Sequence, residues 1–399
     1  MKHLLRLLVA LVVLQPLAAM DAGQKAQLEN CLSQRQYLTA AQFLDKLDPD
    51  NRDPDALVQK IQISINYFAQ SMNHKLFAFK DLSGTETIES VRKQGGAFQF
   101  EKSLDVPAAV DALSARYPND GRLLAALGDF YVDVFRRYGQ NGPFPNCAQS
   151  AVGAYKRAIA AGAKEAIDPA SVALVALQIG DYDLAEASYR EALARDPNNA
   201  ECSYNLAFAL VNLSKFADAS RYANDAYRKY VDPKLKRDAL LMYSDCLLYQ
   251  SKTTEALDLY TKMLADEPQN LFILRRQIQC YLGLNRAAEL EKVFNQYMVL
   301  SGADPTSVSR LSGPFQSSIE YTKRYIALAD KWLKSAQAAG KADSIETQGT
   351  LSYYEAFAFK ATGDQRMYRT RLNEAKAYFQ KIFPSDHPIF KQIESNLEN

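Results

Sequence analysis

The sequence predicts an all-α fold: a right-handed superhelical solenoid of antiparallel helix pairs, with a small irregular embellishment near the N-terminus. Two observations predict it. Small and aromatic residues recur with a period of 34 residues, from Ala185 to Ala219 and again from Ala256 to Leu290. Prolines such as Pro268 close the repeated segments, because proline cannot continue a helix. One short helix pair cannot cover its own apolar faces, so such pairs must stack on one another.

The chain opens with a segment that differs from the rest. Basic side chains precede a run of Leu, Val and Ala over residues 4–14, and small residues follow. This order is typical of a secretory signal peptide, and the run is shorter than the roughly 20 apolar residues that span a bilayer. We expect residues 1–19 to be a signal peptide, cleaved after Ala19 or Ala22, with an uncleaved anchor as the alternative. The mature chain is then exported, periplasmic or secreted, with no transmembrane segment.

Two helix signatures recur in the middle of the chain. The first helix of a pair has the pattern L-x-x-L-G-x-x-Y, and the second has A-x-x-x-Y-x-x-A. The first signature consists of Leu124, Leu127, Gly128 and Tyr131. The second occurs as Ala151, Tyr155 and Ala158, as Ala185, Tyr189 and Ala192, and as Ala256, Tyr260 and Met263. Small residues allow two helices to approach closely, and the tyrosines fill the remaining volume.

These motifs resemble the tetratricopeptide repeat (TPR) family, and the resemblance covers residues 121–305. It implies a repeat array over that range. An insertion of 11 residues within the segment 136–147 separates the two helices of the first clear unit, and its Gly and Pro content predicts a surface loop. We assign residues 24–120 to a degenerate helical repeat and residues 306–399 to a further degenerate repeat with a C-terminal cap.

Residues 76–103 interrupt the helical pattern. Alternating residues around Phe77, and again over residues 97–101, give two weak strand signals. Ser83 and Glu86 have the spacing of a capping box and predict a short helix that opens there. We interpret the segment as a small strand-bearing insertion, with a pair of ordinary loops as the alternative.

The composition argues against several functions. Lys plus Arg number 47 against 46 for Asp plus Glu, so there is no basic excess for phosphate contacts and we expect no nucleic-acid partner. His74 and His387 are isolated, and no metal-ligand spacing, nucleotide-binding loop or nucleophile motif occurs. We therefore expect no catalytic residue, metal or cofactor. The five cysteines are dispersed, and we interpret most of them as buried apolar residues.

In TPR proteins the concave face is lined mainly by first-helix residues, so the resemblance implies a groove for a protein or peptide. Carried onto this sequence, those positions give Tyr204, Asn205, Phe208, Asn212, Met242, Asp245, Tyr249, Arg275, Arg276 and Gln279. Tyr, Phe, Met and Arg are common at binding hot spots. Because these side chains face a groove, we expect them to be only partly buried and to matter little for stability.

Three hypotheses follow. The leading one is a protein- or peptide-binding scaffold of the cell envelope that acts through the concave face. The second is a structural subunit of a multi-protein envelope assembly. The third, less favoured, is an enzyme whose site lies near the insertions at 76–103 and 136–147.

Overall fold

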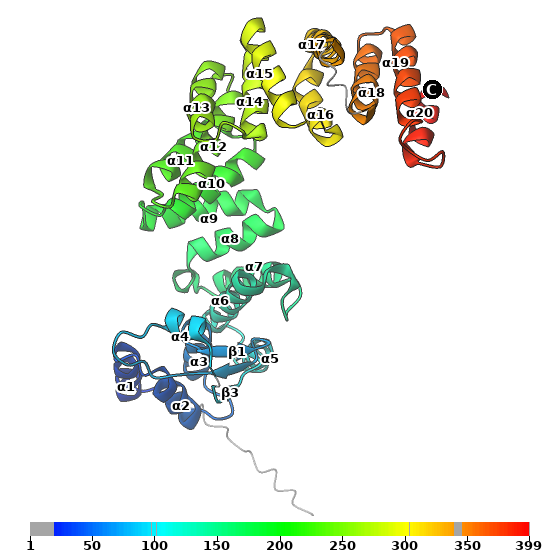
Figure 1. Ribbon diagram of the computed structural model, residues 1–399. Helices are drawn as coiled ribbons and strands as arrows, with labels where there is room; N and C mark the ends of the chain where they lie inside the picture. Colours follow the sequence, from blue (N-terminus) through cyan, green and yellow to red (C-terminus); the bar gives the residue numbers. More distant parts are fainter. Residues whose placement is uncertain (1–19, 97, 101, 303, 339–344, 399) are drawn as a thin grey trace, which may run out of the picture. The chain divides into compact units, whose positions relative to one another are not determined.

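The computed structural model describes residues 20–96, 98–100, 102–302, 304–338 and 345–398, so the expected signal peptide lies outside the described residues. The chain divides into two compact units, Met1–Leu213 and Ser214–Asn399. Each consists mainly of helices packed in consecutive pairs, which confirms the predicted all-α solenoid class (Figure 1). No helix in the described ranges is long and apolar enough to cross a membrane.

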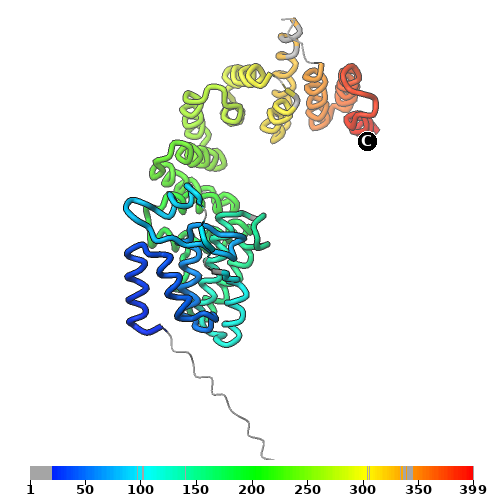
Figure 2. The backbone as a smooth tube through the Cα atoms, turned by 60° about the horizontal axis from the view of Figure 1, so that its bottom comes forward, coloured from blue at the N-terminus to red at the C-terminus, as the bar shows by residue number. Residues whose placement is uncertain are grey.

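The first unit combines ten helices with one three-stranded sheet among its described residues. The helices are α1 (Ala22–Ser33), α2 (Tyr37–Leu47), α3 (Pro54–Asn66), α4 (Ile88–Gln94), α5 (Val106–Ser114), α6 (Gly121–Tyr138), α7 (Cys147–Ala160), α8 (Pro169–Ile179), α9 (Tyr182–Arg195) and α10 (Ala200–Asn212). The strands are β1 (Gln70–Met72), β2 (Leu76–Ala78) and β3 (Lys102–Ser103). The blue helices α1, α2 and α3 run side by side in Figures 1 and 2.

Acidic side chains cap the N-termini of many of these helices. Asp53 accepts hydrogen bonds from two backbone N–H groups at the start of α3, and Asp168 does the same at the start of α8. Such caps satisfy donors that have no partner within the helix. At α1, Asp21 and Gln24 form a capping box, and Met20 immediately before it is buried in the core. Among the described residues, Met20 is therefore the first that belongs to the packed core.

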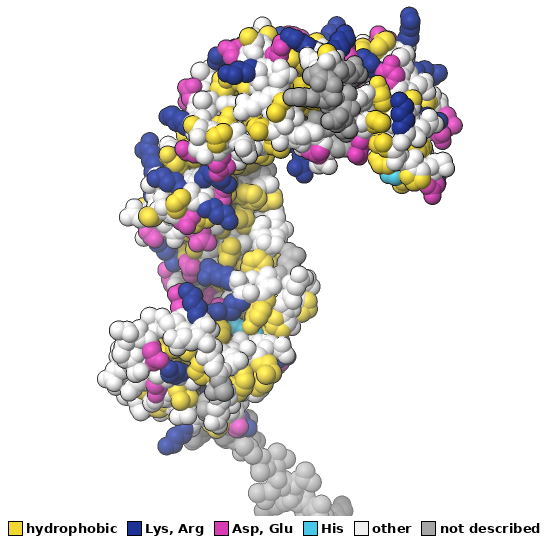
Figure 3. Space-filling model, in the orientation of Figure 1, with side chains coloured by type: hydrophobic (Ala, Val, Ile, Leu, Met, Phe, Trp, Pro, Cys, Tyr) yellow, Lys and Arg dark blue, Asp and Glu magenta, His cyan; other side chains and the backbone are white. Residues whose placement is uncertain are grey.

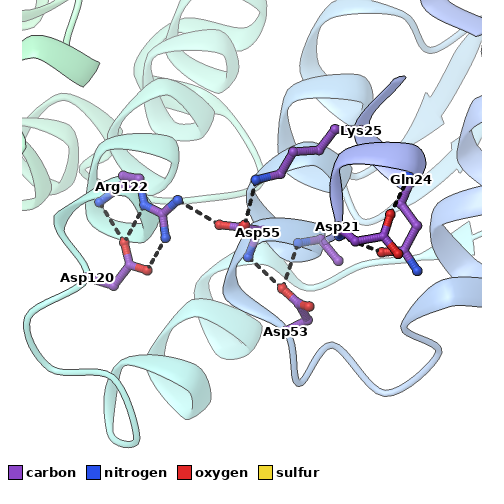
Figure 4. A network of polar contacts seen from close by, with 8 residues as sticks. Asp21, Gln24, Lys25, Asp53, Asp55, Asp120 and Arg122 are labelled. Carbon is purple, nitrogen blue, oxygen red and sulfur yellow. Dashed lines mark hydrogen bonds and ion pairs between the residues drawn. The ribbon is translucent and has the colours of Figure 1, made fainter. Parts of the chain in front are cut away.

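An ion-pair network around Asp55 joins three helices of the first unit (Figure 4). Lys25 of α1 lies 3.3 Å and Arg122 of α6 lies 2.6 Å from the carboxylate of Asp55 on α3. A second carboxylate, that of Asp120, lies 2.8 Å from the same Arg122 side chain. The network joins the N-terminal ends of α1 and α6 to the N-terminal end of α3.

The insertion at 76–103 is part of a slightly longer motif. β1 pairs antiparallel with β2, which pairs antiparallel with β3. The first predicted strand signal, around Phe77, corresponds to β2. No strand was predicted at β1. Residues 97 and 101 of the second predicted signal lie outside the described residues. The Ser83 N–H does donate to the Glu86 side chain at 3.0 Å, as in the predicted capping box, but no helix begins at this position. Thr87 and Ser90 form the box that opens α4, whereas Gly84, at φ +54°, places Ser83 and Glu86 in a turn.

His74 fixes this motif to α6. Its Nε2 lies 3.0 Å from the carboxylate of Asp133, and its ring has no exposed surface. Four aromatic rings surround it: those of Phe68, Phe77, Phe130 and Tyr138. The imidazole therefore joins two elements of the fold rather than facing an open cleft.

The helix pair α6–α7 packs at Gly128. A Cβ added at this glycine would lie 2.4 Å from the ring of Tyr155, so only glycine fits without a shift. The hydroxyl of Tyr155 donates to Asp129 at 2.8 Å. Ala151 of this pair and Ala185 of the next are likewise fully buried. The small residues of the repeated signatures thus lie where helices approach closely.

The second unit is helical throughout its described residues. Its helices are α11 (Phe216–Lys229), α12 (Pro233–Tyr249), α13 (Thr253–Asp266), α14 (Leu271–Gly283), α15 (Ala287–Leu300), α16 (Pro305–Ser312), α17 (Ile319–Ala338), α18 (Ile345–Ala361), α19 (Gln365–Phe379) and α20 (Pro388–Glu398). A 3-10 turn, Gly313–Ser317, precedes α17. The pair α18–α19 repeats the contact at Gly128, since a Cβ at Gly349 would lie 2.7 Å from the ring of Phe379.

The five cysteines are all described, buried and unpaired. Burial raises the pKa of the Cys246 and Cys280 thiols to about 12, which leaves them protonated and unreactive. They pack as small apolar residues.

Candidate partner-binding site

The predicted wall residues of the first unit all lie on α10. Phe208 and Asn212 are exposed, while Tyr204 and Asn205 are partly buried. The Asn212 amide donates to the Phe208 carbonyl oxygen at 2.9 Å, within the same helix. Of this group, Phe208 therefore presents the largest apolar surface to solvent.

The predicted wall residues of the second unit come from α12 and α14. Met242, Asp245 and Tyr249 lie on α12, and Arg275, Arg276 and Gln279 lie on α14. An ion pair joins the two helices: Arg276 Nη2 lies 2.8 Å from Asp245 Oδ2. The first helices of two successive pairs, α12 and α14, therefore meet at this contact.

Asp245 and Arg276 are largely occupied with each other. The hydroxyl of Tyr260, on α13, also donates to Asp245, and Arg276 Nη1 donates to Gln279 at 3.2 Å. Both charged side chains are only about one-fifth exposed, at 21% and 19%. Our expectation that wall residues matter little for stability therefore does not extend to this pair, which links three helices.

A hydroxyl–carboxylate contact recurs between first and second helices. Tyr155 bonds to Asp129 in the first unit, and Tyr260 bonds to Asp245 in the second. The partners are 26 residues apart in one pair and 15 in the other, and this difference equals the 11-residue insertion within 136–147. Burial is the main cause that raises the pKa of the Asp129 carboxyl and of the Tyr260 phenol. This polar contact was not predicted, because the repeated tyrosines were expected only to fill the volume between the helices.

We call three exposed or partly exposed side chains of α12 and α14 the aromatic wall: Tyr249, Phe272 and Arg275. Tyr249 is 53% exposed, and its ring stacks on Phe216 with 4.8 Å between centroids. Phe272 is 38% exposed, and the Arg275 guanidinium lies over its ring at 5.4 Å. Arg275 forms no ion pair with any described residue. Phe216, which supports Tyr249, was not predicted because it opens a second helix.

The loop at 136–147 contacts residues 74 and 75, which directly precede the insertion at 76–103. Tyr138 contacts the His74 ring, and Lys75 lies 5.4 Å from the Phe144 ring. These contacts are packing and cation–π interactions, and His74 is buried among aromatic rings. No group of three or more His, Cys, Asp or Glu side chains in the described part of the chain could hold a metal ion.

The comparisons with known proteins agree with this helix-pair geometry. Residues 176–237 match the family model described as tetratricopeptide repeat. Residues 176–237 therefore have the pattern of a tetratricopeptide repeat. Folds built from such repeats are typically non-catalytic scaffolds for protein interactions.

Solved structures of TPR proteins resemble the chain only loosely. A tetratricopeptide repeat protein from Parabacteroides merdae is 12% identical, with 73% of this chain and 91% of that chain covered and a TM-score of 0.35. The pilF protein of Pseudomonas aeruginosa is 16% identical, with 63% and 99% covered and a TM-score of 0.37. Neither superposition supports a functional argument at these scores. A search of curated proteins found no match.

Proposed function

We propose that this chain is a binding scaffold that takes a protein or peptide segment on the first-helix surface of its second unit. The observation that carries the proposal is the aromatic wall. Tyr249 and Phe272 expose large apolar surfaces, yet each ring is held by a neighbour, Phe216 or Arg275. A side chain already held in one orientation loses little entropy on binding, so most of its buried area contributes to affinity.

The chemistry of the wall defines the partner. Arg275 offers a guanidinium without an acidic partner among the described residues, whereas the charge of Arg276 is already balanced by Asp245. A carboxylate of the partner can accept two parallel hydrogen bonds from such a guanidinium. We therefore propose a segment that combines an apolar or aromatic side chain with Asp or Glu.

The cellular setting is part of the same proposal. The basic head and apolar run of residues 1–19 support export, which would place the scaffold in the cell envelope or outside the cell. Charges of both signs are mixed on the face of each unit in Figure 3, as for a surface that meets solvent. N-terminal sequencing of the protein from an envelope fraction tests this part separately from binding.

A phage-displayed peptide library panned against the chain from Met20 onward tests the wall. We expect selected peptides to contain acidic and aromatic residues. The Tyr249→Ala/Arg275→Ala variant should bind them more weakly by about 2 kcal/mol, the scale of hot-spot truncations. Arg221 and Tyr222, a similar cation–π pair on α11, provide the matched control.

Each outcome of the titration has a clear meaning. Loss of affinity in the wall variant but not in Arg221→Ala/Tyr222→Ala supports the proposed site. Equal affinity in the wall variant and the wild type would place binding elsewhere, and the hypothesis of a structural subunit would then lead. The circular dichroism of all three proteins should match, because these side chains are partly exposed.

A further inference from the structure

A cavity of about 490 Å³ lies in the C-terminal part of the second unit, and none of its lining residues belongs to the aromatic wall. The lining comes from α16, the 3-10 turn, α17, α18 and α20. The lining residues that carry the argument are Gln316, Tyr353, Phe357, Ala361 and Gln392. Both glutamines and the alanine are exposed, and the two rings are partly exposed, so a molecule from solution can reach them.

The lining residues of α18 occupy the same positions in their helix as the aromatic wall does in α12 and α14. A residue with positive φ follows each of these first helices: Ser251, Asn285 and Gly363. Tyr353 precedes Gly363 by ten residues, as Arg275 precedes Asn285 by ten. Ala361 precedes Gly363 by two residues, as Tyr249 precedes Ser251 by two. Because spacing along a helix determines which residues share a face, the cavity belongs to the same first-helix surface as the wall.

The chemistry of the cavity differs from that of the wall. Its lining, which consists of described residues, carries no charged side chain. Tyr353 and Phe357 contact each other edge to face at 5.0 Å, and the buried rings of Phe315 and Tyr325 contact at 5.3 Å. A charged group would lose its hydration here without gaining an opposite charge, which is costly, whereas an apolar group gains by leaving water. The cavity therefore favours an uncharged apolar group.

The row of first helices links the two places. α14 contacts the 3-10 turn that follows α16, and α16 contacts α18, so the row continues from the wall to the cavity (Figure 1). Two steps between helices packed about 10 Å apart amount to roughly 20 Å. An extended chain rises about 3.3 Å per residue, so about six residues span that distance. Binding pockets commonly enclose about 300–1,000 Å³, so the cavity is large enough for a bulky side chain.

We propose that the cavity holds an uncharged apolar side chain of the partner segment, about six residues from the acidic and aromatic residues that bind the aromatic wall. The inference rests on the proposed function, because it takes the occupant of the cavity to be that same partner. The rings of Tyr353 and Phe357 pack against the apolar side chain. The carboxamides of Gln316 and Gln392 can bond to backbone N–H and C=O groups of the segment beside it.

The test uses the peptides selected from the phage library on the chain from Met20 onward, labelled with fluorescein and titrated by fluorescence anisotropy. Ala361→Phe places a ring at the cavity, and Ala327→Phe places the same ring at an exposed position of α17 outside the lining, as the control. The wall variant Tyr249→Ala/Arg275→Ala is titrated in parallel. N-Phenyl-1-naphthylamine, an uncharged dye that fluoresces in apolar surroundings, reports on the cavity directly.

We expect Ala361→Phe to weaken peptide binding roughly tenfold or more, as for the loss of a buried anchor, and Ala327→Phe to leave it unchanged. The dye should bind the wild type and Ala327→Phe but not Ala361→Phe, and the peptides should displace it. Affinity lost only in the wall variant would overturn this inference and leave the proposed function standing. Affinity lost in neither variant, or a library that yields no peptide, would overturn both. Absence of dye binding to the wild type, or a dye that the peptides do not displace, would overturn the inference alone.

Discussion

Replacing Gly128 by Ala should destabilise the first unit even though Ala forms helices better than Gly. A Cβ at this position would lie 2.4 Å from the ring of Tyr155, far inside van der Waals contact. The ring cannot easily move, because it is buried and its hydroxyl is bound to Asp129. Overpacking destabilises a protein by about 1–3 kcal/mol, and the higher helix propensity of Ala offsets about 1 kcal/mol of this loss. With an overlap this severe, we expect a net loss of about 2 kcal/mol in the free energy of unfolding.

Gly153 on α7 is the matched control for this prediction. It is exposed, and a Cβ there would meet no atom within 4 Å, so Gly153→Ala should stabilise the protein by up to about 1 kcal/mol. Urea unfolding followed by far-UV circular dichroism measures both variants. Tyr155→Leu should make room for the new methyl group and render Gly128→Ala nearly neutral in that background. A Gly128→Ala protein as stable as the wild type would refute the close approach of α6 and α7.

Four further predictions concern other parts of the chain. Ala185→Leu should cost about 1–3 kcal/mol of stability in the same urea assay, because Ala185 is fully buried between helices. Arg276→Ala should cost about 1–2 kcal/mol by leaving Asp245 without its cation, whereas Arg275→Ala should stay within about 0.5 kcal/mol of the wild type. A chain that begins at Gly23 should melt below one that begins at Met20, since it lacks the buried Met20 and the cap of α1; equal melting would show that neither contributes. Burial raises the pKa of Glu355 to about 8, and the Arg371 guanidinium, which also pairs with Asp330 and Glu374, offsets this rise only in part. The folded state then holds a proton on Glu355 that the unfolded chain releases near pH 4.5. The contribution of this group to the free energy of unfolding is therefore fully present below pH 4.5 and is lost as the pH rises to about 8. We expect a loss of roughly 2–4 kcal/mol over that window and a nearly flat profile for Glu355→Gln; identical profiles would show that Glu355 is not the group responsible.

The helix pairs could be predicted from the sequence because their contacts are local. Gly128 meets Tyr155, and Gly349 meets Phe379, each within one helix hairpin. Spacing along a helix determines which residues share a face, so a recurring small residue and a recurring aromatic residue indicate the packed pair. Positions such as Tyr249 and Arg275 followed from the same register, and whether they bind a partner stays a prediction.

The β1 strand and the burial of His74 could not be predicted in this way. β1 has a weak local pattern and is held by pairing with β2, and His74 is buried because α6 supplies Asp133 and an aromatic surface. A three-residue strand has little preference of its own, so its neighbours decide its conformation. No helix begins at Ser83 for a related reason, since Gly84 adopts a positive φ that the S-x-x-E spacing does not reveal.

Tertiary structure alone determines which charged side chains remain free to bind a partner. In the sequence, Arg275 and Arg276 are adjacent and equivalent, yet Arg276 pairs with Asp245 from another helix pair and Arg275 does not. The cavity around Tyr325 likewise depends on segments between residues 312 and 392 that no repeat pattern connects. Local spacing determines which helices form and which faces they bury, because those preferences act within a few turns. Ion pairs and cavities depend on side chains from several elements meeting in space, so only the folded chain defines them.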